Sequence, residues 1–356
     1  INQNTFIWNG NVAPSAVVKL HYSVQADLSI GRDGSLNGSS IELMPADLTE
    51  AQKALVPHLA DKPAFSANFT ADEAKAMVKN QLALAAFGTD NALLSATWVQ
   101  AAKVLDDLYT KGDADADEAG LGVSYEDGAI NTAVWAPTAR NVQLKVYDSG
   151  RNLTATHAMS LDTASGIWHY SGSDALDRQF YRFEVQVYHP LTKKVETIEA
   201  TDPYSLNTAT NGRYSQFVSL ADADTKPANW DSHEVPVVAN AEDTVIYEGH
   251  IRDFSVRDTT VTAANRGKYL AFTEADSAPM QHLKALKDAG LTYFHLLPAF
   301  DIATVNEDPA KRVDITDTVA KLCDLSASAA VCSDANVSKS ALIKDVLAGY
   351  DPASSA

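Results

Sequence analysis

One pattern in the last third of the sequence restricts the fold more than any other: a strand, a helix and a second strand in succession. The first strand is the apolar run at 245–247, and the second is the nearly continuous apolar stretch "LTYFHLLPAFD" at 291–301. Between them, Ser277 is expected to cap a helix, Pro279 fits its first turn and Gly290 ends it. A right-handed crossover makes the two strands parallel. Apolar parallel strands are normally covered on both faces, so the pattern predicts part of an α/β layer.

Polar side chains follow both strands at their carboxyl ends, where α/β folds collect functional groups. These candidates are Glu248, His250, Arg252, Asp253, His295 and Asp301. The simplest interpretation of His295, which lies inside an apolar run, is a core histidine with satisfied hydrogen bonds. Arg252 and Asp253 are most simply an ion pair at the rim of the sheet. The pattern leaves the role of Glu248 open.

Charge and motifs exclude several classes of protein. The 356 residues predict two or three domains. The chain has 28 basic and 46 acidic side chains, and the resulting net charge of −18 argues against nucleic acid or an anionic membrane as partner. No apolar stretch approaches the roughly 20 residues of a membrane span, and the opening "INQNTFIWNG" lacks the pattern of a signal peptide. The GxGxxG, HExxH and GxSxG motifs of other enzyme classes are absent as well.

The first two thirds of the chain divide into two regions joined by an acidic stretch. Residues 1–112 predict strands with a helical insertion, in which Thr70 and Glu73 form a capping box and "GTDN" turns an alternating hairpin. Residues 113–120, "DADADEAG", predict a solvated linker. A calcium loop of the EF-hand type would need a glycine at the sixth position and a carboxylate at the twelfth, where Glu118 and Ser124 stand.

Residues 121–228 contain short strands separated by turn residues, a spacing typical of a β-sandwich. The strand–helix–strand pattern then falls within the last region, residues 229–356. Taken together, the regions predict a multidomain chain in which β-rich domains precede an α/β portion.

Several stretches resemble the bacterial type I pullulanases of the α-amylase clan, glycoside hydrolase family thirteen. "VIYEGHIRDFS" and "LTYFHLLPAFDIATVNE" resemble the opening of that family's (β/α)8 TIM barrel, and "AVWAPTARNVQLKVYD" resembles the isoamylase-type carbohydrate-binding module before the barrel. Residues 1–112 are similar to a further accessory domain of secreted members. The resemblance implies two β-sandwich-like accessory domains, then the first βαβ portion of the barrel with a long insertion after its second strand.

The resemblance implies a starch-debranching hydrolase that cleaves α-1,6-glucosidic bonds in pullulan, starch or glycogen by a retaining double displacement. That mechanism needs two carboxyl groups about 5–5.5 Å apart, and the family motifs that supply them are absent from this sequence. We therefore expect no catalytic residue in this chain, no activity of the chain alone, and a remaining C-terminal barrel portion as its partner. No cofactor is expected to be required. A structural calcium ion is compatible with the family, but no ligand set in this sequence stands out and no metal-binding residue is assigned.

An alternative from a different class is a non-catalytic α-glucan-binding protein with a vestigial barrel segment. In both readings the partner is an α-glucan polysaccharide. Aromatic rings stack on sugar rings, and the candidates for substrate binding are Trp135, Trp168 and Tyr204.

The sequence has two cysteines, Cys323 and Cys332, whose spacing matches neither redox nor zinc motifs. Spacing alone leaves open a local disulfide or two unrelated thiols. The resemblance places both in the barrel insertion, where a cysteine pair resembles the disulfide of secreted members. This implies a disulfide and an extracellular or cell-surface location.

Overall fold

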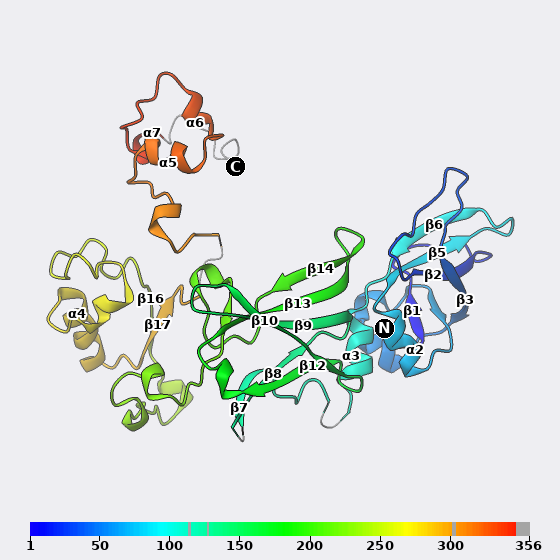
Figure 1. Cartoon of the computed structure of the whole chain (residues 1–356), viewed down its shortest axis with the longest axis horizontal. Coiled ribbons are helices and arrows are strands. Elements are labelled where there is room, and N and C mark those ends of the chain that lie inside the picture. The colour runs from blue at the N-terminus through cyan, green and yellow to red at the C-terminus, as the bar shows by residue number, and fades with distance from the viewer. Residues whose placement is uncertain (113–114, 127, 301–303, 347–356) are drawn as a thin grey trace. The chain divides into compact units, whose positions relative to one another are not determined.

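The computed structural model describes residues 1–112, 115–126, 128–300 and 304–346. The candidate Asp301 lies outside the described residues. The chain forms two compact units, Ile1–Thr225 and Lys226–Ala356 (Figure 1). No described helix has the length and apolar character that a membrane crossing needs.

The first domain of unit one is a six-stranded antiparallel sheet in the order β1-β4-β3-β2-β5-β6, coloured blue to cyan in Figure 1. Its strands are β1 (Thr5–Ile7), β2 (Val17–Ser23), β3 (Ser39–Ala46), β4 (Ala64–Ser66), β5 (Gln81–Phe87) and β6 (Leu93–Trp98). Its helices are α1 (Glu50–Leu55), α2 (Ala71–Met77) and α3 (Ala102–Tyr109). One face of the sheet buries an apolar core that includes Trp8, Leu20 and Leu84.

The predicted hairpin and capping box are present in this domain. β5 pairs antiparallel with β6, and Thr70 and Glu73 exchange side-chain and backbone hydrogen bonds at the start of α2. The prediction that both hairpin arms alternate was wrong for β5, because all seven of its residues are buried. The second face of this central strand is covered by a loop whose Leu28 N–H donates to Gln81 Oε1 at 2.8 Å.

The second domain is the predicted β-sandwich. One sheet has the order β10-β9-β13-β14, with β15 beside β13, and the other has the order β11-β12-β8-β7 (Figure 1). The strands are β7 (Gly122–Glu126), β8 (Ala129–Trp135), β9 (Ala139–Tyr147), β10 (Leu153–Ala158), β11 (Ser160–Asp162), β12 (Ile167–Ser173), β13 (Phe180–His189), β14 (Lys194–Ala200) and β15 (Ser215–Gln216). Side chains of both sheets meet in one core around Val142, Leu144 and Phe183.

Direct polar contacts join the first domain to the sandwich. Lys75, on α2, donates from Nζ to the carbonyl oxygens of Thr163 and Ala164 at 2.7 and 3.0 Å. Arg140, on β9, donates from both Nε and Nη2 to the Lys79 carbonyl oxygen at 3.2 Å. These hydrogen bonds from charged side chains to carbonyl oxygens connect the two domains within one compact unit.

The second unit contains the predicted strand–helix–strand pattern. β16 (Ile246–His250) pairs in parallel with β17 (Tyr293–Leu297), and α4 (Ala278–Asp288) connects them. Gly290 follows the helix at a φ of 111°, the left-handed region that favours glycine. Ser277 occupies the predicted N-cap position, and Pro279 lies in the first turn. The Ser277 hydroxyl makes no capping hydrogen bond, and the Ala278 N–H donates instead to Thr260 Oγ1 at 2.8 Å.

The two parallel strands are more exposed than the apolar pattern predicted. β17 alternates between exposed and half-buried residues, and Tyr293 is 50% exposed. The reason is that, among the described residues, β16 and β17 pair only with each other. A two-stranded sheet leaves both outer edges and part of each face open.

A small helical region with the predicted disulfide ends the described chain. It contains α5 (Val319–Leu325), α6 (Ala330–Ser333) and α7 (Ile343–Val346) around buried Val319, Val331 and Ile343. Cys323 on α5 and Cys332 on α6 form a disulfide with a Cα–Cα distance of 5.5 Å.

Candidate functional site

The polar candidates on the parallel strands make two groups of contacts. In the register, Glu248 of β16 lies directly opposite His295 of β17. Glu248 Oε2 is 3.0 Å from His295 Nδ1, and both side chains are 57% exposed. The interpretation of His295 as a core histidine was therefore wrong: its ring is exposed and partnered by a carboxylate. A carboxylate at this distance orients the imidazole ring.

The second group of contacts lies at the carboxyl end of β16. His250 Nδ1 accepts hydrogen bonds from the backbone N–H groups of Arg252 and Asp253 at 3.1 and 3.4 Å. Arg252 Nη1 lies 3.3 Å from Asp253 Oδ1, with both side chains 66% exposed, which confirms the predicted rim ion pair. Such an exposed pair contributes little to stability, so these groups are free to serve another contact.

The three aromatic candidates lie in different environments. Trp168 is 6% exposed in the sandwich core, and its Nε1 donates to the Ala136 carbonyl oxygen at 3.1 Å. The prediction that Trp168 stacks on a sugar was wrong, because a stacking ring needs an exposed face. Trp135 is half-buried and donates to the Ser165 carbonyl oxygen at 3.0 Å, whereas Tyr204 is 46% exposed. For these two residues sugar binding stays a prediction.

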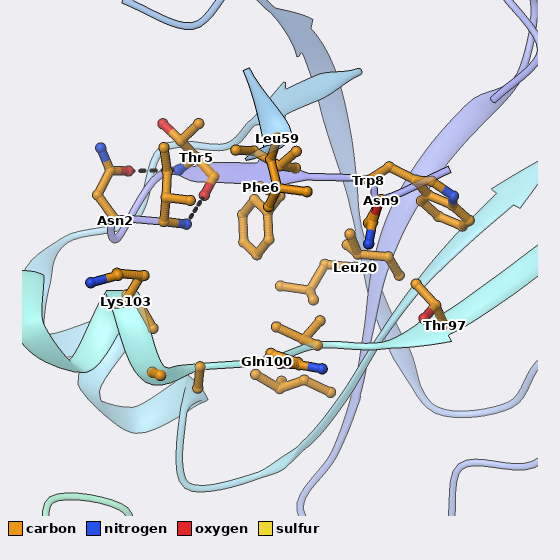
Figure 2. A pocket seen from close by; sticks show the side chains of 18 of the residues that line it. Asn2, Thr5, Phe6, Trp8, Asn9, Leu20, Leu59, Thr97, Gln100 and Lys103 are labelled. Atoms are coloured by element: carbon orange, nitrogen blue, oxygen red, sulfur yellow. Dashed lines mark hydrogen bonds between the residues drawn. The ribbon is translucent and has the colours of Figure 1, made fainter. Parts of the chain in front are cut away.

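A cavity of about 810 Å³ lies inside the first domain. In the view of Figure 2, Phe6 and Leu59 lie above the cavity, Gln100 lies below it and Lys103 lies to its left. The residues that line it include no Asp or Glu. It therefore offers no carboxyl group for acid–base chemistry.

The acidic linker brings three carboxylates together at its described end. Ligand oxygens of Asp115, Asp117 and Glu118 lie within 4.8 Å of one another. A hydrogen bond between Asp115 and Asp117 lowers the pKa of Asp115 and raises that of Asp117. Exposed acidic clusters are common in linkers, and no further feature of the site points to a cation.

Trp98, an exposed aromatic residue of the first domain, was not among the candidates from the sequence. Trp98 is 45% exposed at the end of β6, and Lys193 Nζ, from the turn between β13 and β14, lies 5.1 Å from its ring centroid. The alternation of the hairpin places Trp98 on the same face as the small residues Ala83 and Ala96. That pattern was available from the sequence, whereas the approach of Lys193 was not.

Three family models match consecutive parts of the chain. Residues 1–107 match the pullulanase N2 domain, residues 120–205 match carbohydrate-binding module 48 (the isoamylase N-terminal domain), and residues 302–355 match the pullulanase Ins domain. The fold and these matches define a set of β-rich accessory domains followed by an insertion domain.

Curated pullulanases are similar in sequence to most of this chain. The pullulanase of Klebsiella pneumoniae is 38% identical over 332 residues, which is 92% of this chain and 30% of that protein. Chloroplastic pullulanase 1 of Arabidopsis thaliana is 34% identical over 318 residues, or 86% of this chain and 32% of that protein. The chain thus spans about a third of the length of these relatives.

Solved structures share the fold. A maltotriose complex of PulA from Klebsiella pneumoniae matches 98% of this chain and 37% of that chain, with 36% identity and a TM-score of 0.85. PulA from Klebsiella oxytoca matches 98% of this chain and 33% of that chain, with 36% identity and a TM-score of 0.86. The chain therefore matches the N-terminal domains of pullulanases and corresponds to about the N-terminal third of these relatives.

Proposed function

We propose that this chain is the N-terminal portion of a starch-debranching hydrolase that cleaves α-1,6-glucosidic bonds in pullulan, starch or glycogen. The observation that carries the proposal is 38% identity to a pullulanase over 92% of the chain. The retaining mechanism uses one carboxylate as nucleophile and a second carboxyl group as acid and then base, about 5–5.5 Å apart. Because these groups complete the chemistry by themselves, no cofactor is required.

We assign the two catalytic carboxyl groups to barrel strands outside this chain. Glu248 is the acidic residue on β16 and β17, and its partner is the imidazole of His295. Such a pair suits the binding of a hydroxyl group more than nucleophilic attack, because the imidazole already engages the carboxylate.

The strand–helix–strand segment is then the start of a (β/α)8 barrel, and its partner is the rest of that barrel. Support comes from the parallel register of β16 and β17 and from the exposed apolar side chains around them. Ile246 is 63% exposed, Tyr247 43% and Leu297 39%. Further strands pairing at the open edges would bury this surface.

The proposal also covers the location of the protein, the binding of a calcium ion and the choice of partner. The disulfide in the region that matches the Ins domain supports an extracellular or cell-surface location, since disulfides persist in oxidising compartments. A structural calcium ion stays a hypothesis without assigned ligands, and the sign of the protein's charge makes nucleic acid an unfavourable partner.

The proposal is tested by joining the chain to the remainder of the Klebsiella pneumoniae relative, in place of the matching segment. The chimera is expected to release reducing sugar from pullulan, whereas the chain alone is expected to release none. Hydrolysis by the chain alone would contradict the assignment of the catalytic groups. A folded chimera that binds pullulan without hydrolysing it would favour the alternative, a non-catalytic α-glucan-binding protein.

A further inference from the structure

An exposed aromatic platform lies at the edge of the first sheet. Trp98 ends the edge strand β6 and is 45% exposed. In the register it lies opposite Ala83, while Ala85 lies opposite Ala96. Because these three neighbours are small and share its face, no large side chain of the two strands covers the indole ring.

A loop completes one wall of a groove beside this ring. The groove has a volume of about 440 Å³, and its apolar lining comprises Leu28, Ile30, Leu36, Ala83, Ala96 and Trp98. The loop is held in shape by the Ile30–Leu36 β-bridge and by Asn37. Asn37 Oδ1 accepts from the Ser29 N–H at 2.6 Å, and its Nδ2 donates to the Asp27 carbonyl oxygen at 2.9 Å. A wall fixed in this way is organised before any ligand binds, which reduces the entropy cost of binding.

The sandwich contributes the cation of the groove. Lys193 lies in the turn between β13 and β14, where its N–H donates to the His189 carbonyl oxygen at 2.8 Å. Its Nζ lies 5.1 Å from the Trp98 ring centroid, within the range of a cation–π contact. Both domains of unit one therefore build this groove, which we name the Trp98 groove.

The chemistry of the lining selects the class of ligand. The polar groups are the Lys193 ammonium and the hydroxyls of Ser29 and Thr97, and the lining includes no acid. The net charge of −18 disfavours a polyanion. A neutral polyhydroxyl chain fits, because its C–H faces pack on the indole and on Ile30 while its hydroxyls accept hydrogen bonds from the ammonium.

We propose that the Trp98 groove binds a segment of α-1,4-linked glucan, as an anchoring site built from residues of unit one. The proposal rests on the proposed function, since it takes an α-glucan as the substrate. It adds a binding site, made by the first domain and the sandwich together, for a part of the same polysaccharide.

Calorimetric titration of the full 356-residue chain with maltoheptaose tests the proposal. We expect the unchanged protein to bind maltoheptaose and not to bind cellohexaose. Trp98→Ala should weaken maltoheptaose binding about tenfold, in the range of a lost aromatic contact. Lys193→Gln should weaken it about threefold. Trp98→Phe, which keeps a ring and protects the fold, should retain most of the affinity.

Two variants serve as matched controls. Trp230→Ala removes an indole that is 62% exposed in the other unit, and Lys194→Gln removes the exposed neighbour of Lys193. Both should bind as the unchanged chain does. The proposal is overturned if the unchanged chain does not bind maltoheptaose, if Trp98→Ala binds with full affinity, or if cellohexaose binds equally well. Each of these results leaves hydrolysis of pullulan by the chimera as an independent test of the proposed function.

Discussion

At the scale of single residues, a buried carboxyl group organises the end of the sandwich. Asp202 is 3% exposed, and its Oδ2 accepts a hydrogen bond of 2.6 Å from the hydroxyl of Tyr181, which is fully buried. Its Oδ1 accepts from the Tyr204 N–H at 2.8 Å. Asp202 thereby fixes the backbone that carries the exposed Tyr204 ring.

This group makes stability depend on pH. Burial raises the pKa of Asp202 above its ordinary value of 3.8, and the hydrogen bonds from Tyr181 and Tyr204 oppose that rise. Because the folded state binds the proton more tightly than the unfolded state, the contribution of Asp202 is fully present below about pH 3.8. It is lost as the pH rises through the raised pKa.

Asp202→Asn removes the charge and keeps one acceptor oxygen for the Tyr204 N–H, while its amide NH2 can donate to the Tyr181 hydroxyl oxygen. We expect the difference in unfolding free energy between variant and unchanged protein to move in favour of the variant between pH 3.5 and pH 7. Urea denaturation at both pH values measures it, with the exposed Asp47→Asn as control. A difference that stays constant with pH would contradict the expectation.

What the sequence could predict depends on the distance over which residues interact. The Thr70–Glu73 box and the Arg252–Asp253 pair are local, so the order of residues was enough to predict them. The pairing of Glu248 with His295 depends on the register of two strands that are far apart in the chain. No local pattern contains that register, which is why His295 was assigned to a core.

At the scale of elements, the cap of α2 supports a contact between domains. The Glu73 N–H donates to Thr70 Oγ1 at 3.2 Å, and the Thr70 N–H donates to Glu73 Oε2 at 2.8 Å. The same helix carries Lys75, which binds two carbonyl groups of the sandwich. Thr70→Ala should lower the unfolding free energy by about 1 kcal/mol, and Thr70→Ser by less than half of that. Equal stability of Thr70→Ala and the unchanged chain in urea would show that the box has no such role.

The contribution of the disulfide to the stability of the α5–α7 region can also be measured. The disulfide closes a loop between residues nine apart, in a region whose buried core contains only a few apolar residues. Replacing both Cys323 and Cys332 by serine should cost that region about 2–3 kcal/mol. Hydrogen exchange of the α5 amides should accelerate accordingly, while exchange in the β9 and β13 amides stays unchanged. Unaltered exchange in α5 would refute this estimate.

The elements also show where a sequence pattern is ambiguous. The apolar run of β17 correctly predicted a parallel strand, but the burial expected from it depends on neighbours that the pattern does not contain. The opposite error occurred for β5, which alternates in sequence and is nevertheless buried on both faces, by the apolar core on one face and by the loop before β3 on the other. In both strands, tertiary contacts decided the exposure.

At the scale of the whole molecule, the two compact units differ in how well each can stand alone. Unit one contains two apolar cores and every residue that lines the Trp98 groove. Unit two exposes Ile246, Tyr293 and Phe300, at 63%, 50% and 90%. Apolar surface of this kind favours association when its natural cover is missing.

Residues 1–225 produced alone should therefore fold and retain the groove, since every residue that lines it belongs to unit one. We expect one cooperative urea transition and maltoheptaose affinity within about twofold of the full chain. Residues 226–356 produced alone should instead bind a hydrophobic dye and self-associate, as measured by fluorescence and light scattering. A soluble, cooperatively folded 1–225 fragment that has lost maltoheptaose binding would show that unit two contributes to the groove, because the fold and the lining residues would both still be present.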